Sequence, residues 1–234
     1  MKFTQEEIMP LLEKLYEKSV DGIPNVSKPI EQLAAEYLEK AVDVQSAAKN
    51  FNKYQIAKCT TSGFLTSFGG VLTLPVTIPA NIGSVLYVQM RMIACLAYMG
   101  GYDIGSDQVQ TLVYACLAGI SLDQIVKRFG VQFGEKFGMA LVKKIPGKTL
   151  QAINKKVGFR LFTKLGEKGL INIGKMVPVL GGVIGGGLDF FETRTIAKRA
   201  YKMFIQGDFA ASGEEDEEAT DEEIYEVDFE EKND

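Results

Sequence analysis

The residues that could do chemistry in this chain are few, because it contains no histidine. Histidine is the usual general base of enzymes and the commonest metal ligand. Catalysis would therefore depend on carboxylates, lysine, tyrosine or thiols. The candidate buried acids are Asp103, Asp107, Asp123 and Asp189, and none has a carboxylate partner at a definable spacing. We expect capping or surface roles for them, and hence a protein that is not an enzyme and uses no metal or other cofactor.

Two fragments have part of the spacing of a phosphate-binding loop. Residues 169–175 end in Gly-Lys, but Met176 replaces the Ser or Thr that would hold magnesium, and no strand is expected before them. Gly147-Lys148-Thr149 has the required ending, but Val142 occupies the position of the first glycine. Neither fragment predicts nucleotide binding.

A cationic segment runs from Lys143 to Lys175 and contains nine Lys or Arg residues and one acid. Many of its bases recur at multiples of four, opposite a row of aliphatic residues, which predicts short amphipathic helices. Such helices fit an anionic membrane surface, where each nearby base contributes roughly 1 kcal/mol. The residues predicted to bind that surface are Lys144, Lys148, Lys155, Lys156, Arg160, Lys164 and Lys168.

Two other interpretations of the cationic segment remain open: a solvated face with no partner, and a nucleic-acid surface. Nucleic acid would need exposed aromatic side chains on which bases can stack. Helical spacing instead predicts that the phenylalanines of this region are core residues, so we do not expect nucleic acid as a partner. These phenylalanines are Phe129, Phe133, Phe137, Phe159 and Phe162.

An uncharged stretch occupies residues 59–90. A spanning helix needs about 20 apolar residues, so its length would suffice to cross a bilayer. Two adjacent glycines and two prolines interrupt it, however, and proline disrupts a helix interior. We predict a helix, an apolar turn at residues 68–80 and a second helix; whether the stretch enters a bilayer stays open. The predicted membrane or ligand contacts are Phe64, Phe68, Val71, Leu72, Leu74, Val76 and Ile78.

A second apolar patch, residues 176–188, is rich in glycine. Small residues at four-residue spacing let helices approach backbone to backbone. Packing inside a helical bundle, oligomerisation and membrane insertion all fit this pattern. We expect this patch and the uncharged stretch to bury each other. The glycines predicted to pack helices are Gly69, Gly70, Gly181, Gly182, Gly185 and Gly186.

Charge is distributed unevenly along the chain. Residues 213–234 carry thirteen acids and one lysine, whereas the remainder is net basic. So acidic a segment cannot bury enough apolar surface to order itself, which predicts a disordered tail. The tail could fold back on the cationic segment and weaken membrane docking. Its few apolar residues could act as a short docking motif: Ile224, Tyr225, Val227 and Phe229.

The location expected for the chain is cytoplasmic. Residues 1–20 are polar and amphipathic and lack the apolar core of a secretory signal. The cysteines Cys59, Cys95 and Cys116 are odd in number and lie in apolar helical surroundings. They are expected to be free, buried thiols in a reducing compartment.

The fold class predicted is all-α, because apolar residues follow helical spacing and no segment alternates like a strand. One helical bundle should hold the broken apolar hairpin at its centre. The expected parts are an amino-terminal helix and linker (1–28), a helical domain (29–207) and the acidic tail (208–234). The expected helices cover residues 5–19 after a Thr4–Glu7 capping box, Ile30 to Val42, Asp43 to Lys58, Asn81 to Gly100, Val109 to Leu117, and Pro178 through Phe204.

Several short motifs follow one another along the chain: Gln55-Ile56-Ala57-Lys58, Gly63-Phe64-Leu65-Thr66 with Gly69-Gly70, Leu74-Pro75, Pro79-Ala80-Asn81, Gly101-Tyr102-Asp103, Ile153-Asn154-Lys155-Lys156-Val157-Gly158 and the segment from Pro178 to Gly181. In this order they resemble the EcsC family of bacterial proteins. The resemblance covers about residues 30–206 and implies a helical, often membrane-associated protein with no settled enzymatic activity. It supplies no catalytic residues, and Gly101-Tyr102-Asp103 is expected to be structural.

The function predicted from these patterns is reversible, peripheral association with a membrane. The expected partner is an anionic membrane surface or lipid, with a protein partner or a second copy also open. One alternative is a soluble helical module that binds a lipid or another hydrophobic ligand. The other is an effector that permeabilises membranes.

Overall fold

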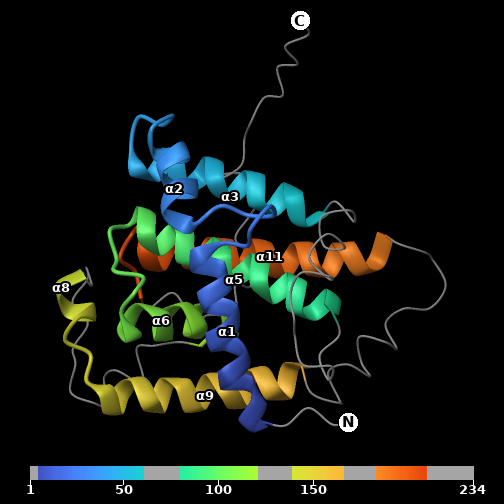
Figure 1. The fold of residues 1–234 in the computed structure, drawn as a ribbon, viewed down its shortest axis with the longest axis vertical. Helices are drawn as coiled ribbons and strands as arrows, with labels where there is room; N and C mark the ends of the chain where they lie inside the picture. The colour runs from blue at the N-terminus through green and yellow to red at the C-terminus, as the bar shows by residue number, and fades with distance from the viewer. Residues whose placement is uncertain (1–4, 61–79, 121–138, 166–182, 210–234) are drawn as a thin grey trace, which may run out of the picture.

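The computed structural model describes residues 5–60, 80–120, 139–165 and 183–209. These residues form α-helices and no strand, as the sequence predicts (Figure 1). A 3₁₀ turn, η1 (Gln5–Glu7), leads into the first helix. The helices are α1 (Ile8–Asp21), α2 (Ile30–Leu38), α3 (Val44–Thr60), α5 (Ala80–Met99), α6 (Asp107–Ala118), α8 (Met139–Val142), α9 (Gly147–Leu165) and α11 (Val183–Phe204).

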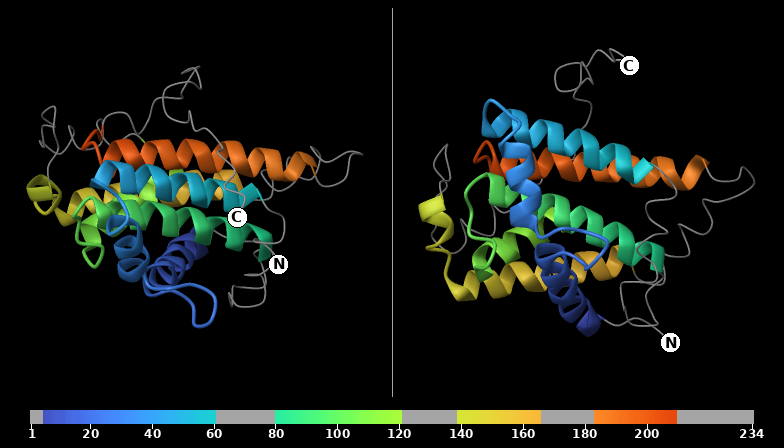
Figure 2. Two further views of the ribbon diagram at one scale, coloured as in Figure 1. Left: turned by 90° about the horizontal axis from the view of Figure 1, so that it is seen from above. Right: turned by 45° about the horizontal axis from the view of Figure 1, so that its top comes forward.

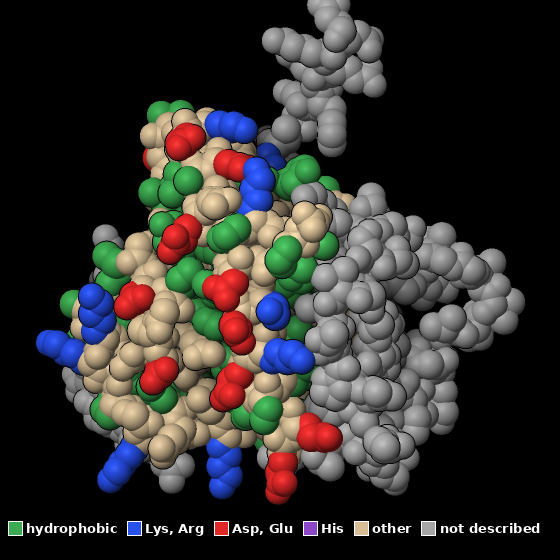
Figure 3. Space-filling model, viewed as in Figure 1, with side chains coloured by type: hydrophobic (Ala, Val, Ile, Leu, Met, Phe, Trp, Pro, Cys, Tyr) green, Lys and Arg blue, Asp and Glu red, His purple; other side chains and the backbone are tan. Residues whose placement is uncertain are grey.

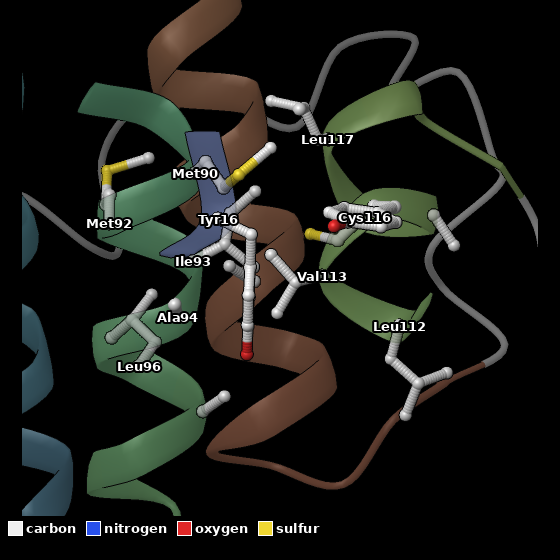
Figure 4. Close-up of a cluster of buried hydrophobic side chains, with 14 of the residues drawn as sticks. Tyr16, Met90, Met92, Ile93, Ala94, Leu96, Leu112, Val113, Cys116 and Leu117 are labelled. Carbon is white, nitrogen blue, oxygen red and sulfur yellow. The ribbon is translucent and has the colours of Figure 1, made fainter. Parts of the chain in front are cut away.

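Helix α5 is the centre of the bundle and contacts α1, α2, α3, α6 and α11. Nearly all of its described side chains are buried. A helix that is apolar nearly all round must be covered by protein or lipid, and these five helices cover α5. Figure 4 shows Tyr16 of α1 among α5 side chains such as Met90 and Ile93 and α6 side chains such as Val113. Part of the uncharged stretch thus forms the first half of this central helix. No described helix is long and apolar enough to cross a membrane.

Helix α9 lies along one edge of the body, where it packs against α6, α1 and η1 (Figure 1). Leu150, Ile153, Val157 and Leu161 are buried in that contact, as their spacing predicts. Within the described part of the cationic segment, residues 147–165 form one continuous helix; residues 166–175 lie outside the described residues.

Four helix ends lie at the same end of the body (Figures 1 and 2). They are the carboxyl ends of α3 and α9 and the amino ends of α5 and α11. Residues 61–79 connect α3 to α5, and residues 166–182 connect α9 to α11. The two apolar segments singled out in the sequence are thus both attached to one end of the helical body.

Side chains cap the starts of α3 and α6. The Asp43 Oδ1 accepts a hydrogen bond from the Ser46 backbone N at 2.7 Å, and α3 begins there. The Ser106 Oγ accepts from the Val109 N at 3.4 Å at the start of α6. The predicted extension of α2 to Val42 is wrong: the helix ends at Leu38, and Val42 is fully exposed in the turn before α3. Thr4 of the predicted capping box is outside the described residues.

The Gly101-Tyr102-Asp103 motif ends α5 and starts the turn to α6. Gly101 has φ of +83°, and the Gly101 and Tyr102 amides donate to the carbonyls of Tyr98 and Ala97 at 2.9 and 3.0 Å. This is a Schellman ending, which needs a left-handed residue and so favours glycine. The Asp103 carboxylate accepts from the Gly105 amide at 3.1 Å. The expected structural role of the motif is confirmed.

Candidate functional site

The outward side of α9 carries a cationic surface, which we call the basic face. Its described side chains are all exposed, and residues 139–165 contain no Asp or Glu. The buried aliphatic row on the opposite side fixes the rotation of the helix, so these bases point away from the core. The basic face consists of Lys148, Lys155, Lys156 and Arg160 on α9, together with the exposed Lys143 and Lys144 in the turn that precedes it.

Phe159 lies in the basic face, and 58% of its surface is exposed. The prediction that it is a core residue is wrong, because it stands two positions from both Val157 and Leu161. Two residues turn an α-helix by about 200°, which places Phe159 opposite the buried row. The spacing of Phe159 from Val157 and Leu161 in the sequence was the signal that could have indicated its exposed position. An exposed phenylalanine among lysines is typical of helices that lie in a membrane interface.

The face seen in Figure 3 differs in charge from the edge where α9 runs. Acidic side chains, with some Lys and Arg side chains among them, lie over α1 and α2 down the middle of this view, whereas Lys and Arg side chains project from the lower edge, along α9. Residues 139–165, which include α9, contain no acid. An anionic surface would therefore be attracted to the α9 edge more than to the mixed α1 face.

Much of the predicted membrane contact lies outside the described residues. Lys144, Lys148, Lys155, Lys156 and Arg160 are brought together on the basic face. Lys164 is in the last turn of α9, and Gly185 and Gly186 are in the first turn of α11; the structure describes only their backbone. Outside the described residues are Lys168, Phe64, Phe68, Val71, Leu72, Leu74, Val76, Ile78, Gly69, Gly70, Gly181 and Gly182.

Of the candidate carboxylates, the two whose side chains the structure describes are not assembled into a site. Asp103 and Asp107 are both exposed. The Asp103 carboxylate accepts a hydrogen bond from the Gly105 amide, and Asp107 lies in the first turn of α6. Asp123 and Asp189 have no described side chain. Within the described parts of the chain, no group of three or more Cys, Asp or Glu side chains is placed to hold a metal ion.

The Gly147-Lys148-Thr149 fragment does not form a phosphate-binding loop. It is the first turn of α9, and the element before it is helix α8. The Thr149 side chain is fully buried, so its hydroxyl cannot face a magnesium ion held at the surface.

A second polar centre, which the sequence did not indicate, surrounds Arg91 in the middle of α5. Only 9% of this residue is exposed. Its guanidinium donates to the Ser19 carbonyl, in the last turn of α1, at 2.7 Å, and to the Lys28 carbonyl in the α1–α2 linker. Burial lowers the pKa of Arg91 from its ordinary value. No carboxylate among the described residues pairs with it, so helix-end and linker carbonyls stabilise the charge.

The linker that Arg91 holds is tightly folded. The Ser27 hydroxyl hydrogen-bonds the Tyr87 hydroxyl at 2.7 Å and accepts from the Ile23 amide at 2.9 Å. Gly22 has φ of +78°, and a Cβ there would lie 2.4 Å from the Ser27 carbonyl oxygen. The Arg91 centre therefore joins α1, the linker and α5, and we assign it a structural role.

The thiols of Cys95 and Cys116 are free and buried, as predicted. Burial raises the pKa of each to about 12. Because the thiolate is the reactive form, burial disfavours nucleophilic chemistry at both cysteines. Cys59 has no described side chain.

The sequence profile of the EcsC protein family matches residues 4–206. The chain belongs to the EcsC family. The match includes α1, which the motif resemblance left out, and α1 packs against α5, α2 and α9. It ends shortly before the acidic tail. No curated protein and no solved structure matches this EcsC chain.

Proposed function

We propose that this EcsC protein docks reversibly on anionic membrane surfaces through the basic face of α9, without catalytic activity. The observation that carries the proposal is Phe159, an exposed aromatic side chain on a helix side that otherwise presents lysine and arginine. Burying a phenylalanine stabilises by roughly 1.5–3 kcal/mol, and each base near an anionic surface adds about 1 kcal/mol. Together these contributions support micromolar, salt-sensitive binding.

The common location of the four helix ends supports a second part of the proposal. In this proposal the uncharged stretch is a broken apolar hairpin, and residues 64–78 and the glycines at 181–186 contact lipid or each other beside the docked body. The carboxyl end of α9 lies at the same end as the joins to both segments (Figure 2). Electrostatic attraction and apolar contact would then act at neighbouring places.

Neutralising three lysines of the basic face should abolish most of the binding. In a K148Q/K155Q/K156Q variant, three charges near the membrane are lost, so affinity for anionic vesicles should fall roughly hundredfold. Sedimentation with phosphatidylglycerol-containing vesicles measures this loss. Vesicles of zwitterionic phosphatidylcholine, which have no net charge, should bind neither the variant nor the unmodified protein.

The matched control removes the same charge elsewhere. Lys18 on α1, Lys40 after α2 and Lys49 on α3 are exposed and lie off α9. A K18Q/K40Q/K49Q variant should bind almost as well as the unmodified protein. Equal losses in both variants would mean that net charge alone governs binding and would contradict docking through α9. Dye release during binding would instead indicate a permeabilising effector, and co-purifying lipid without vesicle binding would indicate a ligand-binding module.

A further inference from the structure

We infer that the acidic tail of this chain, residues 214–231, occupies the basic face of α9 and competes there with anionic lipid. The competition with lipid rests on the proposed function, whereas the intramolecular contact does not. The tail is therefore the regulatory partner of the same surface.

The described chain ends close to the start of the cationic segment. Phe209 is buried, and its ring centroid lies 6.4 Å from that of Tyr102 and 6.3 Å from that of Phe204. A Cβ added to Gly101, next to Tyr102, would lie 3.1 Å from the Met139 sulfur. Met139 begins α8, which leads directly to Lys143. The tail is thus anchored beside the amino end of the basic face.

The length of the tail suffices to cover α9. The acidic run begins at Glu214, five residues after Phe209, a distance of about 16 Å in extended chain. Residues 210–234 together can span about 80 Å, whereas the helix from Gly147 to Leu165 is about 28 Å long. The tail therefore reaches every base of the basic face without strain.

The charges of the two segments are complementary. Residues 214–231 carry twelve acids and no base, and the basic face carries six exposed bases with no acid in residues 139–165. The face over α1 and α2 carries acids mixed with Lys side chains, so it offers the tail no comparable cationic surface (Figure 3). The tail also contains Ile224, Tyr225, Val227 and Phe229, and Phe159 offers them an exposed apolar partner.

A single tryptophan can report the contact, because the chain contains none. In a Phe159→Trp variant, the docked tail should shield the indole from acrylamide at low salt. Quenching should rise about twofold in 1 M NaCl, where the Debye length falls to about 3 Å. It should rise similarly at low salt when the acids of residues 214–218 and 221–223 are changed to their amides in the full-length chain. A Tyr54→Trp variant places the reporter on exposed α3, away from α9, and should not respond.

The outcomes separate the tail contact from membrane docking. If changing the tail acids to amides increases quenching of the Phe159→Trp variant and tightens its binding to anionic vesicles at least roughly tenfold, both the tail contact and membrane docking are supported. Increased quenching without any vesicle binding supports the tail contact and refutes the proposed function. If quenching of the Phe159→Trp variant changes neither with salt nor with the amide substitutions in the tail, the tail contact is refuted. This holds even where the amide variant binds vesicles more tightly. An equal response at residue 54 also refutes it.

Discussion

Changing Gly100 to alanine should destabilise the protein by roughly 3 kcal/mol, because the new methyl group has no space. A Cβ at this position would lie 2.1 Å from the carbonyl oxygen of Phe204 and 3.1 Å from its carbonyl carbon. Both atoms are backbone, so no side chain can rotate away. The carboxyl end of α11 would have to move from α5, disturbing the contact between the Tyr102 and Phe204 rings, whose centroids are 5.3 Å apart.

Thermal unfolding measures this effect. For a chain of this size each kcal/mol lowers the midpoint by about 2–4 °C, so we expect a loss of roughly 6–12 °C. Gly147→Ala is the control, because a Cβ at this first residue of α9 would meet nothing within 4 Å. Equal midpoints for the two variants would show that α5 and α11 are not in the close contact described.

Changing Arg91 to methionine should cost about 3 kcal/mol, although methionine fills much of the same volume. The substitution leaves the buried carbonyl of Ser19 and the part-buried carbonyl of Lys28 without this donor. Unpaired buried polar groups each cost about 1–3 kcal/mol. The linker should also loosen, because Arg91 joins it to α5.

Chemical denaturation and hydrogen exchange measure these two consequences. Exchange of the amides of Ile23, Val26 and Ser27, which all donate within the linker turn, should quicken more than exchange in α6. Arg160→Met on the basic face is the matched control and should change stability by less than about 0.5 kcal/mol. If the two arginine variants are equally stable, the Arg91 centre has no structural role.

The helices could be predicted from the sequence largely because their determinants are local. Asp43 and Ser106 cap helices with atoms only three residues away. Gly101 ends α5 through its own backbone angles. Such signals operate within one turn of the chain and need no knowledge of the remaining fold.

Side-chain environments were harder to predict, because they depend on contacts between distant residues. Arg91 marks the end of the uncharged stretch, but it is buried because carbonyls of residues 19 and 28 approach it from α1 and the linker. Phe159 was assigned to the core by helical spacing, whereas its register relative to Val157 and Leu161 places it outside. The bases of the candidate site thus followed from their spacing, and its apolar centre required knowing which row of α9 is buried.

If the basic face of α9 touches the membrane, as we propose, Phe159 must enter it. The most direct test is the fluorescence of the Phe159→Trp variant on anionic vesicles whose acyl chains carry bromine, which quenches indole only near the bilayer interior. We predict a blue shift and strong quenching for this variant, and neither for Tyr54→Trp on α3. Binding of the protein without quenching at residue 159, or equal quenching at both positions, would contradict docking through α9.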